Sequence, residues 1–300
     1  MSRKNKVIVI LGPTASGKSQ LALKLAQKFN GFIISADSRQ IYQKMNIATA
    51  KPSQADRQLI PHFMIDIVKP GKNFSVAEYQ QQVFKILHAN LRSKQPKLPF
   101  IVGGTGLYIQ AMVDNLNIPR AAPDENLRQK LAKKSAAWLL AKLEKVDPIS
   151  CQKISANNKR RLIRALEVYE KTGQPFSAWQ NKGESEFEFL QIGLKLDRQK
   201  LYQRINERME KMITTGLVEE VKNLRKKYDQ KLPSMSGLGY KEIGLYLDSK
   251  INLPEAINLL KRNTRHYARK QISWFSRDKK IKWVESYKQA EKIVKDFVCQ

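Results

Sequence analysis

The chain is poor in cysteine and in long apolar runs, and each shortage excludes a class of protein. Cys151 and Cys299 are the two cysteines among 300 residues, and they form no CxxC pair. This excludes a disulfide framework and a cysteine-ligated zinc site, and it fits a reducing compartment. The apolar run at residues 7–11 is too short for a signal-peptide core or a membrane span. We therefore expect a soluble, cytoplasmic protein with no membrane partner.

Acidic residues are also scarce, since 27 Asp and Glu stand against 55 Lys and Arg. The formal net charge of +28 favours a polyanionic partner, because each neutralised phosphate releases condensed counterions. A genome-wide bias toward lysine is the alternative, and charge by itself names no partner. The three histidines show no metal-ligand spacing, so we assign no metal to His62, His88 or His266.

Short apolar segments alternate with helical patterns in the first third of the chain. Segments of this kind are typical of strands buried on both faces of a parallel sheet. Between them, residues 20–26 indicate an amphipathic helix, and Ser75 with Glu78 forms the capping-box pattern that opens a helix toward Leu91. The alternation predicts a doubly wound α/β fold with its site at the carboxyl ends of the strands. The predicted strands are residues 7–11, 32–35, 63–68, 98–102 and 187–196.

A phosphate-binding pattern follows the first predicted strand. Residues 12–19, GPTASGKS, match G-x-x-x-x-G-K-[ST] at every fixed position. Glycines let successive backbone N–H groups point at an anion, and the following helix adds the positive end of its dipole. Lys18 would reach the terminal phosphate, and the Ser19 hydroxyl would bind Mg²⁺. The pattern predicts a di- or triphosphate site formed by Gly12, Pro13, Thr14, Ala15, Ser16, Gly17, Lys18 and Ser19.

The secondary-structure pattern predicted from the sequence changes near residue 114. Residues 123–179 are helical in pattern with few strand signals, and Gly173 is expected to be a helix C-cap. We therefore predict a P-loop NTPase-like parallel-sheet core at residues 1–113 and 187–300, with a helical insertion domain at residues 114–186. The core also carries C-terminal helices, predicted at residues 199–213, 217–228 and 254–275.

The sequence lacks the carboxylate that nucleotide hydrolases usually place at the end of a second buried strand. The segment at residues 98–102 closes with Gly103 and Gly104, and Asp66 is a weak substitute. This argues against nucleotide hydrolysis but leaves other uses of a phosphate loop open. A P-loop small-molecule kinase that uses ATP is one alternative. A non-catalytic RNA-binding protein with a nucleotide-responsive core is another.

Two further segments end predicted strands at the same edge of the sheet. Asp37 follows the strand at residues 32–35, where its carboxylate could hold Mg²⁺ through water, accept a proton or cap the next helix. The glycines around Thr105 would let the backbone approach a ligand, or they form a tight strand-to-helix turn. Because the carboxyl ends of parallel strands meet at one edge, we expect both residues to face the phosphate loop.

The chain contains a series of short motifs in a fixed order. They are GPTASGKS at 12–19, ADSRQIY at 36–42, GGTGLY at 103–108, RRLIRALE at 160–167, GLVEEV at 216–221, GYKE at 239–242 and RKQISWF at 269–275. In order and spacing these motifs resemble the bacterial tRNA dimethylallyltransferases, the tRNA isopentenyltransferases of the IPP transferase family. The resemblance spans about residues 6–285 and is far more specific than the phosphate loop alone.

The resemblance implies transfer of a dimethylallyl group from dimethylallyl diphosphate to N6 of the adenine 3′ of the tRNA anticodon, with Mg²⁺ as cofactor and release of pyrophosphate. It also implies that residues 14–19 and Arg208 bind the diphosphate, that Asp37 is the general base, and that Thr105 contacts donor and tRNA. The residues that would contact the tRNA anticodon stem-loop are Asp37, Ser38, Arg39, Gln40, Thr105, Arg160, Arg161, Leu162, Ile163, Arg164, Lys241, Arg269, Lys270 and Gln271.

The chain departs from the family pattern at a few positions. Arg160 stands where the family usually has Gln, which puts an amide-specific base contact there in doubt. Lys270 and Ser273 replace the usual Arg and Thr, so charge and hydroxyl are retained. The zinc finger that eukaryotic relatives carry is absent from this sequence.

The segment at residues 261–282 fits an RNA partner, since it holds nine Lys or Arg against one acid, Asp278. Basic residues grip a nucleic-acid backbone, and interleaved aromatic rings such as Tyr267 can stack on bases. Trp274 and Phe275 end an amphipathic helix, a position that favours the core over base stacking. The sequence does not indicate an oligomer, and we take a monomer as the default expectation.

Overall fold

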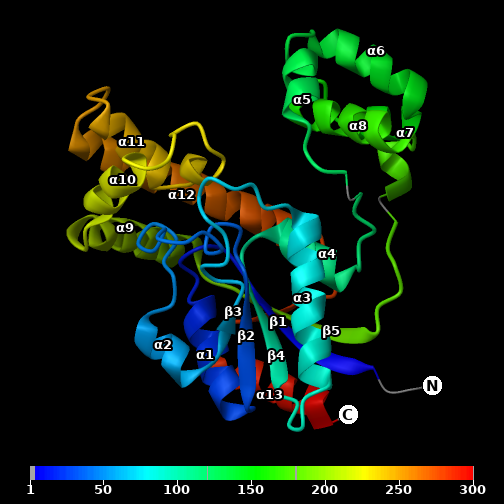
Figure 1. Ribbon diagram of the computed structural model, residues 1–300. Helices are drawn as coiled ribbons and strands as arrows, with labels where there is room; N and C mark the ends of the chain where they lie inside the picture. The colour runs from blue at the N-terminus through cyan, green and yellow to red at the C-terminus, as the bar shows by residue number, and fades with distance from the viewer. Residues whose placement is uncertain (1–3, 120, 180, 300) are drawn as a thin grey trace. The chain divides into compact units, whose positions relative to one another are not determined.

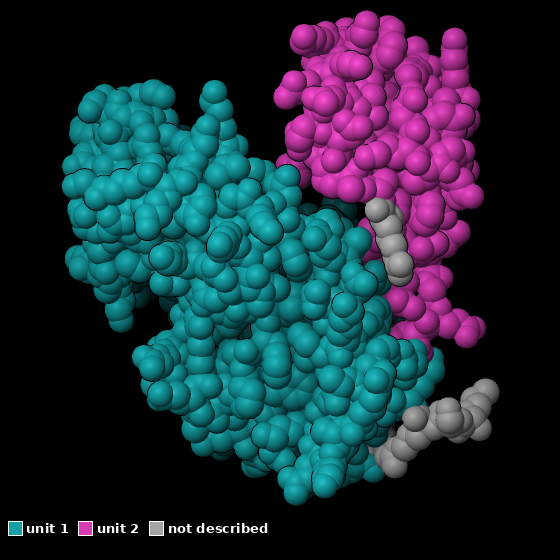
Figure 2. Space-filling view, in the orientation of Figure 1, with its two compact units in different colours: residues 1–109, 186–300 teal, residues 110–185 magenta. Residues whose placement is uncertain are grey.

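The computed structural model describes residues 4–119, 121–179 and 181–299. The chain divides into two compact units, shown in different colours in Figure 2. Unit 1 comprises residues 1–109 and 186–300, and unit 2 comprises residues 110–185. Unit 2 thus begins at residue 110, inside a helix, where the sequence pattern puts the boundary at 114. In the described parts of the chain no helix is long and apolar enough to cross a membrane.

Unit 1 is built on a six-stranded sheet in which every neighbouring pair is parallel. The strand order is β3-β2-β4-β1-β5-β6, so the chain crosses over the sheet through helices (Figure 1). The α/β class predicted from the sequence is confirmed. The strands are β1 (Asn5–Leu11), β2 (Gly31–Ala36), β3 (His62–Phe63), β4 (Leu98–Gly103), β5 (Phe187–Leu194) and β6 (Lys282–Val284).

The strand predicted at residues 63–68 is wrong for most of its length, because β3 ends at Phe63. Met64 and Asp66 have φ angles of 62° and 58°, and an extended strand cannot contain a left-handed residue. The short strand β6 was missed by the sequence pattern. Its three residues bury one side chain, which is too little to produce a strand signal.

Helices cover both faces of the sheet. α1 (Lys18–Lys28) and α13 (Tyr287–Cys299) lie against one face, where their apolar side chains form a common core with alternate residues of the strands. Figure 1 shows α3 (Val76–Leu91) on the opposite face. The capping box predicted for this helix is present, since Ser75 and Glu78 each accept a hydrogen bond from the backbone N–H of the other.

The remaining helices of unit 1 include a second cluster with its own apolar core. In that core, side chains of four α-helices from the C-terminal third of the chain pack around Ile41, Tyr42 and Met45, which follow β2. The phosphate-loop edge of the sheet is thereby joined to the C-terminal helices. The helices of unit 1 outside the sheet layers are α2 (Gln54–Leu59), α4 (Gly106–Val113, shared with unit 2), α9 (Arg198–Thr214), α10 (Leu217–Arg225), the 3₁₀ helix η2 (Ser234–Ser236), α11 (Tyr240–Leu247) and α12 (Leu253–Phe275).

Unit 2 is helical. Its core contains Leu139, Leu143, Leu162 and Leu166, all fully buried. The helix at residues 159–172 is followed by Gly173, whose φ of 69° confirms the predicted C-cap, since a left-handed residue there favours glycine. The elements are α5 (Glu125–Ala132), α6 (Ala136–Val146), α7 (Pro148–Lys153), α8 (Lys159–Thr172) and the 3₁₀ helix η1 (Phe176–Trp179).

Candidate active site

The phosphate loop connects β1 to α1 at the carboxyl edge of the sheet. Ala15 and Gly17 have φ angles of 62° and 94°, so the loop turns sharply before the helix begins at Lys18. The Ser16 hydroxyl is buried and has no hydrogen-bond partner among the described residues. A buried hydroxyl without a partner is unfavourable by about 1–3 kcal/mol. A bound anion in the loop would remove this deficit, so the loop fits a phosphate ligand.

The Lys18 ammonium is the main cation of the loop. It donates a hydrogen bond to the Pro13 carbonyl oxygen at 3.2 Å, and no other described group takes one from it. Burial lowers the pKa of Lys18 to about 8, although nearby Asp37 opposes this effect. An ammonium has three N–H donors, so most of the hydrogen-bonding capacity of Lys18 is available to a ligand.

Helix α9 brings two arginines to the phosphate loop. Arg208, predicted from the family motif, lines the same cavity as Lys18, Ser19 and Asp37, and burial lowers its pKa. Arg204 was missed by the sequence reasoning. It donates to the Ser16 carbonyl oxygen at 3.3 Å and lines the adjoining cavity. Its spacing of four residues from Arg208 places both on one helix face and could have identified it.

Asp37 stands at the end of β2 and caps a turn rather than a helix. Its Oδ1 atom accepts from the backbone N–H of Arg39 at 2.8 Å and of Gln40 at 3.4 Å. Among the described residues no hydrogen bond reaches Oδ2. The Thr105 hydroxyl accepts from the backbone N–H of Ser38 at 3.1 Å, which holds the ends of β2 and β4 side by side. The structure therefore brings Asp37 and Thr105 together at the edge where the phosphate loop lies.

Gln271 was expected to contact tRNA, and the structure shows that its side chain is also engaged within the protein. The side chain is buried, its Oε1 accepts from the Thr14 backbone N–H, and its Nε2 donates to the Gly104 carbonyl oxygen, both at 2.8 Å. A Cβ atom at position 104 would lie 2.2 Å from Nε2, so the position of the Gln271 amide requires glycine there. Gln271 therefore joins the phosphate loop to the second glycine turn, and its side chain also contacts Tyr267.

Other predicted RNA contacts divide into exposed and engaged side chains. Leu162 must be corrected, because its side chain lies fully buried in the core of unit 2, and Ile163 packs partly against that core. Arg164 donates to Glu167 at 2.6 Å and to the Ala121 carbonyl oxygen at 3.2 Å. The exposed members of the predicted set are Arg160, Arg161, Lys241, Arg269 and Lys270.

Two predicted RNA contacts next to Asp37 are also engaged within the protein. Arg39 donates to the carbonyl oxygens of Pro233 and Ser234 and to the Ser236 hydroxyl. The Gln40 amide donates to backbone carbonyls of residues 49 and 50. Both side chains therefore hold the turn that carries Asp37 in place.

The aromatic residues of α12 have different environments. Phe275 is buried, as predicted, but Trp274 is 42% exposed, which contradicts the core position favoured from the sequence. A Cβ atom at Gly106 would lie 2.4 Å from the Trp274 ring, so the indole rests on the glycine turn. Tyr267 reaches the Thr105 side chain, and burial of its hydroxyl raises the pKa of Tyr267 to about 12.

The site also contains groups that no sequence pattern indicated. His62 lines the cavity, and its Nδ1 is 2.7 Å from the Ile60 carbonyl oxygen. Burial lowers the pKa of this imidazole. Asp66 cannot replace the missing hydrolase carboxylate, because one oxygen binds Lys51 and the other binds Arg57 at 2.9 Å. The described residues include no group of three or more His, Cys, Asp or Glu that could hold a metal ion.

A parallel sheet, a phosphate loop after β1 and a cavity that combines Lys18, Arg208 and Asp37 define an α/β enzyme of the P-loop class. Within this class the chain belongs to the IPP transferase family, whose model matches residues 40–278. The resemblance noted from the motifs is thereby confirmed.

Relatives and solved structures agree with this assignment. The chain is 45% identical to the tRNA dimethylallyltransferase of Carboxydothermus hydrogenoformans, over 98% of this chain and 97% of that protein. It is 46% identical to that of Halothermothrix orenii, over 97% and 93%. The crystal structure of the full-length tRNA isopentenylpyrophosphate transferase from Bacillus halodurans matches with a TM-score of 0.70 and 35% identity, over 99% and 96%. A eukaryotic dimethylallyltransferase acting on tRNA matches with a TM-score of 0.83 and 27% identity, over 98% and 80%.

Proposed function

We propose that the enzyme transfers a dimethylallyl group from dimethylallyl diphosphate to N6 of the adenine 3′ of the tRNA anticodon. The observation that carries this proposal is the position of the Asp37 carboxylate in one cavity with the Lys18 ammonium and Arg208. That cavity offers cations for a diphosphate and a base for an amine. Membership of the IPP transferase family supports the same reaction. We also propose that the enzyme is a monomer and acts in the cytoplasm.

The phosphate loop would bind the diphosphate and stabilise its departure. As the allylic C–O bond breaks, negative charge grows on the leaving pyrophosphate. Loop N–H groups, the spare donors of Lys18 and the Arg208 guanidinium would stabilise this charge. Groups that are already in position lower the barrier most, because they need no reorganisation during the reaction. The five-carbon chain would rest on apolar parts of the cavity wall, which include Ile33, Ile65 and Val102.

The residues around the loop also fit Mg²⁺. Ser19 and Asp37 supply oxygen atoms beside the phosphate loop, and Mg²⁺ prefers oxygen ligands that include substrate phosphates and water. When bound there, the ion would supply positive charge to the diphosphate oxygens.

Asp37 would act on the adenine amine. Its Oδ1 is held by two backbone N–H groups, while Oδ2 can accept a proton. The N6–H proton would pass to Oδ2 as the new bond from N6 to the allylic carbon forms and pyrophosphate leaves. The adenine must leave its base stack to reach the cavity, as base-modifying enzymes require. Thr105 and Tyr267 lie beside the Asp37 turn, where they would contact the incoming base.

The tRNA would be held by exposed basic side chains on both units. Arg269 and Lys270 lie on α12 and Lys241 on α11 in unit 1, whereas Arg160 and Arg161 lie at the start of α8 in unit 2. Their charges would neutralise backbone phosphates, a grip that weakens as salt rises.

The test is to incubate the purified protein with unmodified tRNA, Mg²⁺ and dimethylallyl diphosphate, and then to determine nucleoside masses after digestion. The wild type should produce adenosine heavier by one dimethylallyl group. Asp37→Asn retains an oxygen for the turn but removes the base, so we expect kcat to fall by about 10²–10⁴. Glu219→Gln removes an acid that is 66% exposed on α10 and should leave the rate unchanged.

The rival with the clearest prediction is the small-molecule kinase. If the wild type forms no heavier nucleoside but consumes ATP with a small acceptor, the transfer proposal is wrong.

A further inference from the structure

A loop from Gln43 to Pro52, here called the cavity loop, forms one wall of the candidate donor site. Thr49, Ala50 and Pro52 line the same cavity as Lys18 and Asp37. The loop is conformationally demanding, because Lys44 and Ala50 have φ angles of 62° and 47°. Left-handed residues other than glycine persist only where their surroundings hold them, at about 1–3 kcal/mol each.

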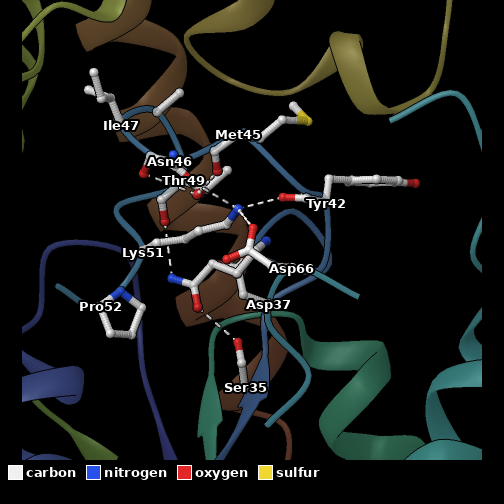
Figure 3. A network of polar contacts seen from close by, with 12 residues as sticks. Ser35, Asp37, Tyr42, Met45, Asn46, Ile47, Thr49, Lys51, Pro52 and Asp66 are labelled. Atoms are coloured by element: carbon white, nitrogen blue, oxygen red, sulfur yellow. Dashed lines mark hydrogen bonds and ion pairs between the residues drawn. The ribbon is translucent and has the colours of Figure 1, made fainter. Parts of the chain in front are cut away.

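Lys51 is the central contact of the cavity loop, as Figure 3 shows. Its ammonium donates to the Tyr42 carbonyl oxygen, to Asn46 Oδ1 at 3.1 Å and to Asp66 Oδ1. The side chain is 3% exposed. An ammonium has three N–H donors, and these three acceptors account for all of them.

The two buried lysines of the site therefore differ in what they can do. Lys18 has donors to spare, whereas the donors of Lys51 are all directed into the protein. Lys51 also lines the adjoining cavity that contains Lys18, but its three donors face protein groups. Its charge is balanced by Asp66, whose second oxygen is held by Arg57. Lys51 is thus arranged to hold protein groups and not a ligand.

Two other side chains fix the cavity loop along its length. The Gln40 amide donates to the carbonyl oxygens of Thr49 at 3.1 Å and Ala50 at 3.2 Å, while its own Oε1 accepts from the Ser35 hydroxyl at 2.9 Å. Glu220 of α10 accepts from three consecutive N–H groups of the loop, those of residues 46 and 47 at 2.8 Å and that of residue 48 at 3.4 Å. The loop is therefore held at three places, and the Lys51 ammonium connects its end to Asn46, to Tyr42 and to Asp66.

We propose that Lys51 is a positioning residue, whose ammonium fixes the cavity loop so that Thr49, Ala50 and Pro52 hold dimethylallyl diphosphate against the phosphate loop without Lys51 touching the donor. The inference rests on the proposed transfer reaction. It extends that reaction by adding a residue that neither the phosphate-loop pattern nor the base position indicates.

The first test is Lys51→Met, which keeps most of the side-chain volume and removes all three hydrogen bonds. A loosened wall should raise the KM for dimethylallyl diphosphate about tenfold, equivalent to about 1.4 kcal/mol, while the KM for tRNA stays within about twofold. Lys44→Met removes an exposed lysine from the same loop and is the matched control, with both KM values unchanged. A Lys51→Met enzyme with wild-type donor KM and only a lower melting temperature overturns the inference.

A double-mutant cycle separates positioning from direct binding of the donor. If Lys51 acts through Asp66, Asp66→Asn alone also raises the donor KM, and the double variant is no worse than Lys51→Met. If Lys51 binds the diphosphate itself, Asp66→Asn frees the ammonium and leaves the donor KM unchanged or lower, which contradicts the proposal. Should Lys51→Met fail to fold, Asn46→Ala removes one of the three contacts and must raise the donor KM by a smaller factor.

Failure of the transfer reaction is distinguishable from failure of this inference. Calorimetric titration with inorganic pyrophosphate and Mg²⁺ measures diphosphate binding without any transfer. Lys51→Met must weaken that binding relative to Lys44→Met even if the wild type modifies no tRNA, and equal binding by the two variants overturns the role of Lys51.

Discussion

At the scale of single residues, the number of unused hydrogen-bond donors separates ligand-binding groups from structural ones. Gln271 and its neighbour Lys270 show the difference, since both lie in the same motif of α12. Gln271 is buried with both ends of its amide engaged, at Thr14 and Gly104, whereas Lys270 is exposed. The same motif therefore contributes one residue to the phosphate loop and another to the surface that would meet RNA.

This contrast gives a prediction for adjacent substitutions. Gln271→Met leaves the Thr14 N–H and the Gly104 carbonyl without their partner, at about 1–3 kcal/mol, and should raise the KM for dimethylallyl diphosphate more than the KM for tRNA. Lys270→Met should do the reverse. Steady-state kinetics with each substrate varied in turn would measure both. If the two variants share one profile, the division of roles between these neighbours is incorrect.

At the scale of elements, a buried carboxylate of unit 2 connects α8 to α5. Glu167 of α8 is fully buried, accepts from Arg128 of α5 at 2.8 Å and 2.9 Å, and accepts from Arg164 and the Asp124 backbone N–H. Burial by itself would raise the pKa of Glu167. The hydrogen bonds from Arg128, the Asp124 backbone and Arg164 outweigh burial, and the pKa lies below its ordinary value of 4.5.

The lowered pKa predicts acid sensitivity of unit 2. The unfolded state takes up a proton at a higher pH than the folded state, so the stabilisation by Glu167 is complete above pH 4.5 and is lost as pH falls through the lower folded pKa. Hydrogen–deuterium exchange of α5 and α8 should accelerate in that range. Glu167→Gln should destabilise unit 2 by about 3 kcal/mol at pH 7. The variant should also lack the acceleration of exchange that protonation of Glu167 causes in the wild type. Unchanged exchange in that variant would contradict the prediction.

At the scale of the whole molecule, the net charge of +28 is the largest single feature of the surface. Basic side chains expected to meet tRNA are exposed on each unit, Arg269 and Lys270 on unit 1 and Arg160 and Arg161 on unit 2. A sum of separate phosphate contacts, rather than one strong contact, should therefore govern affinity for tRNA.

This distribution predicts the salt dependence of tRNA binding. Replacing either pair of basic residues by Ala should reduce the slope of log K against log salt by about 1.4–1.8, because each phosphate contact contributes about 0.7–0.9. The donor KM should stay constant, since these side chains do not line the donor cavity. Fluorescence-anisotropy titrations across a salt series would measure the slopes. A slope equal to that of the wild type would mean that the pair does not contact phosphate.

Local patterns in the sequence determined most of the fold and the family. Buried strands, the phosphate loop, the capping box at Ser75 and the C-cap at Gly173 depend on neighbouring residues, so composition and spacing are enough to predict them. The prediction of a strand at residues 63–68 failed because Met64 and Asp66 adopt left-handed backbone conformations, and the Asp66 side chain binds Lys51 and Arg57 outside the segment.

The tertiary structure alone decided which polar side chains are free. Gln271 is far along the chain from Thr14 and Gly104, and Glu220 is also far from the cavity loop that it holds. Hydrogen bonds between residues so far apart follow no sequence periodicity, so no local sequence pattern predicts them. Whether a polar group binds a ligand or a neighbouring segment depends on which acceptors folding brings within about 3 Å of it, and only the packed chain sets those distances.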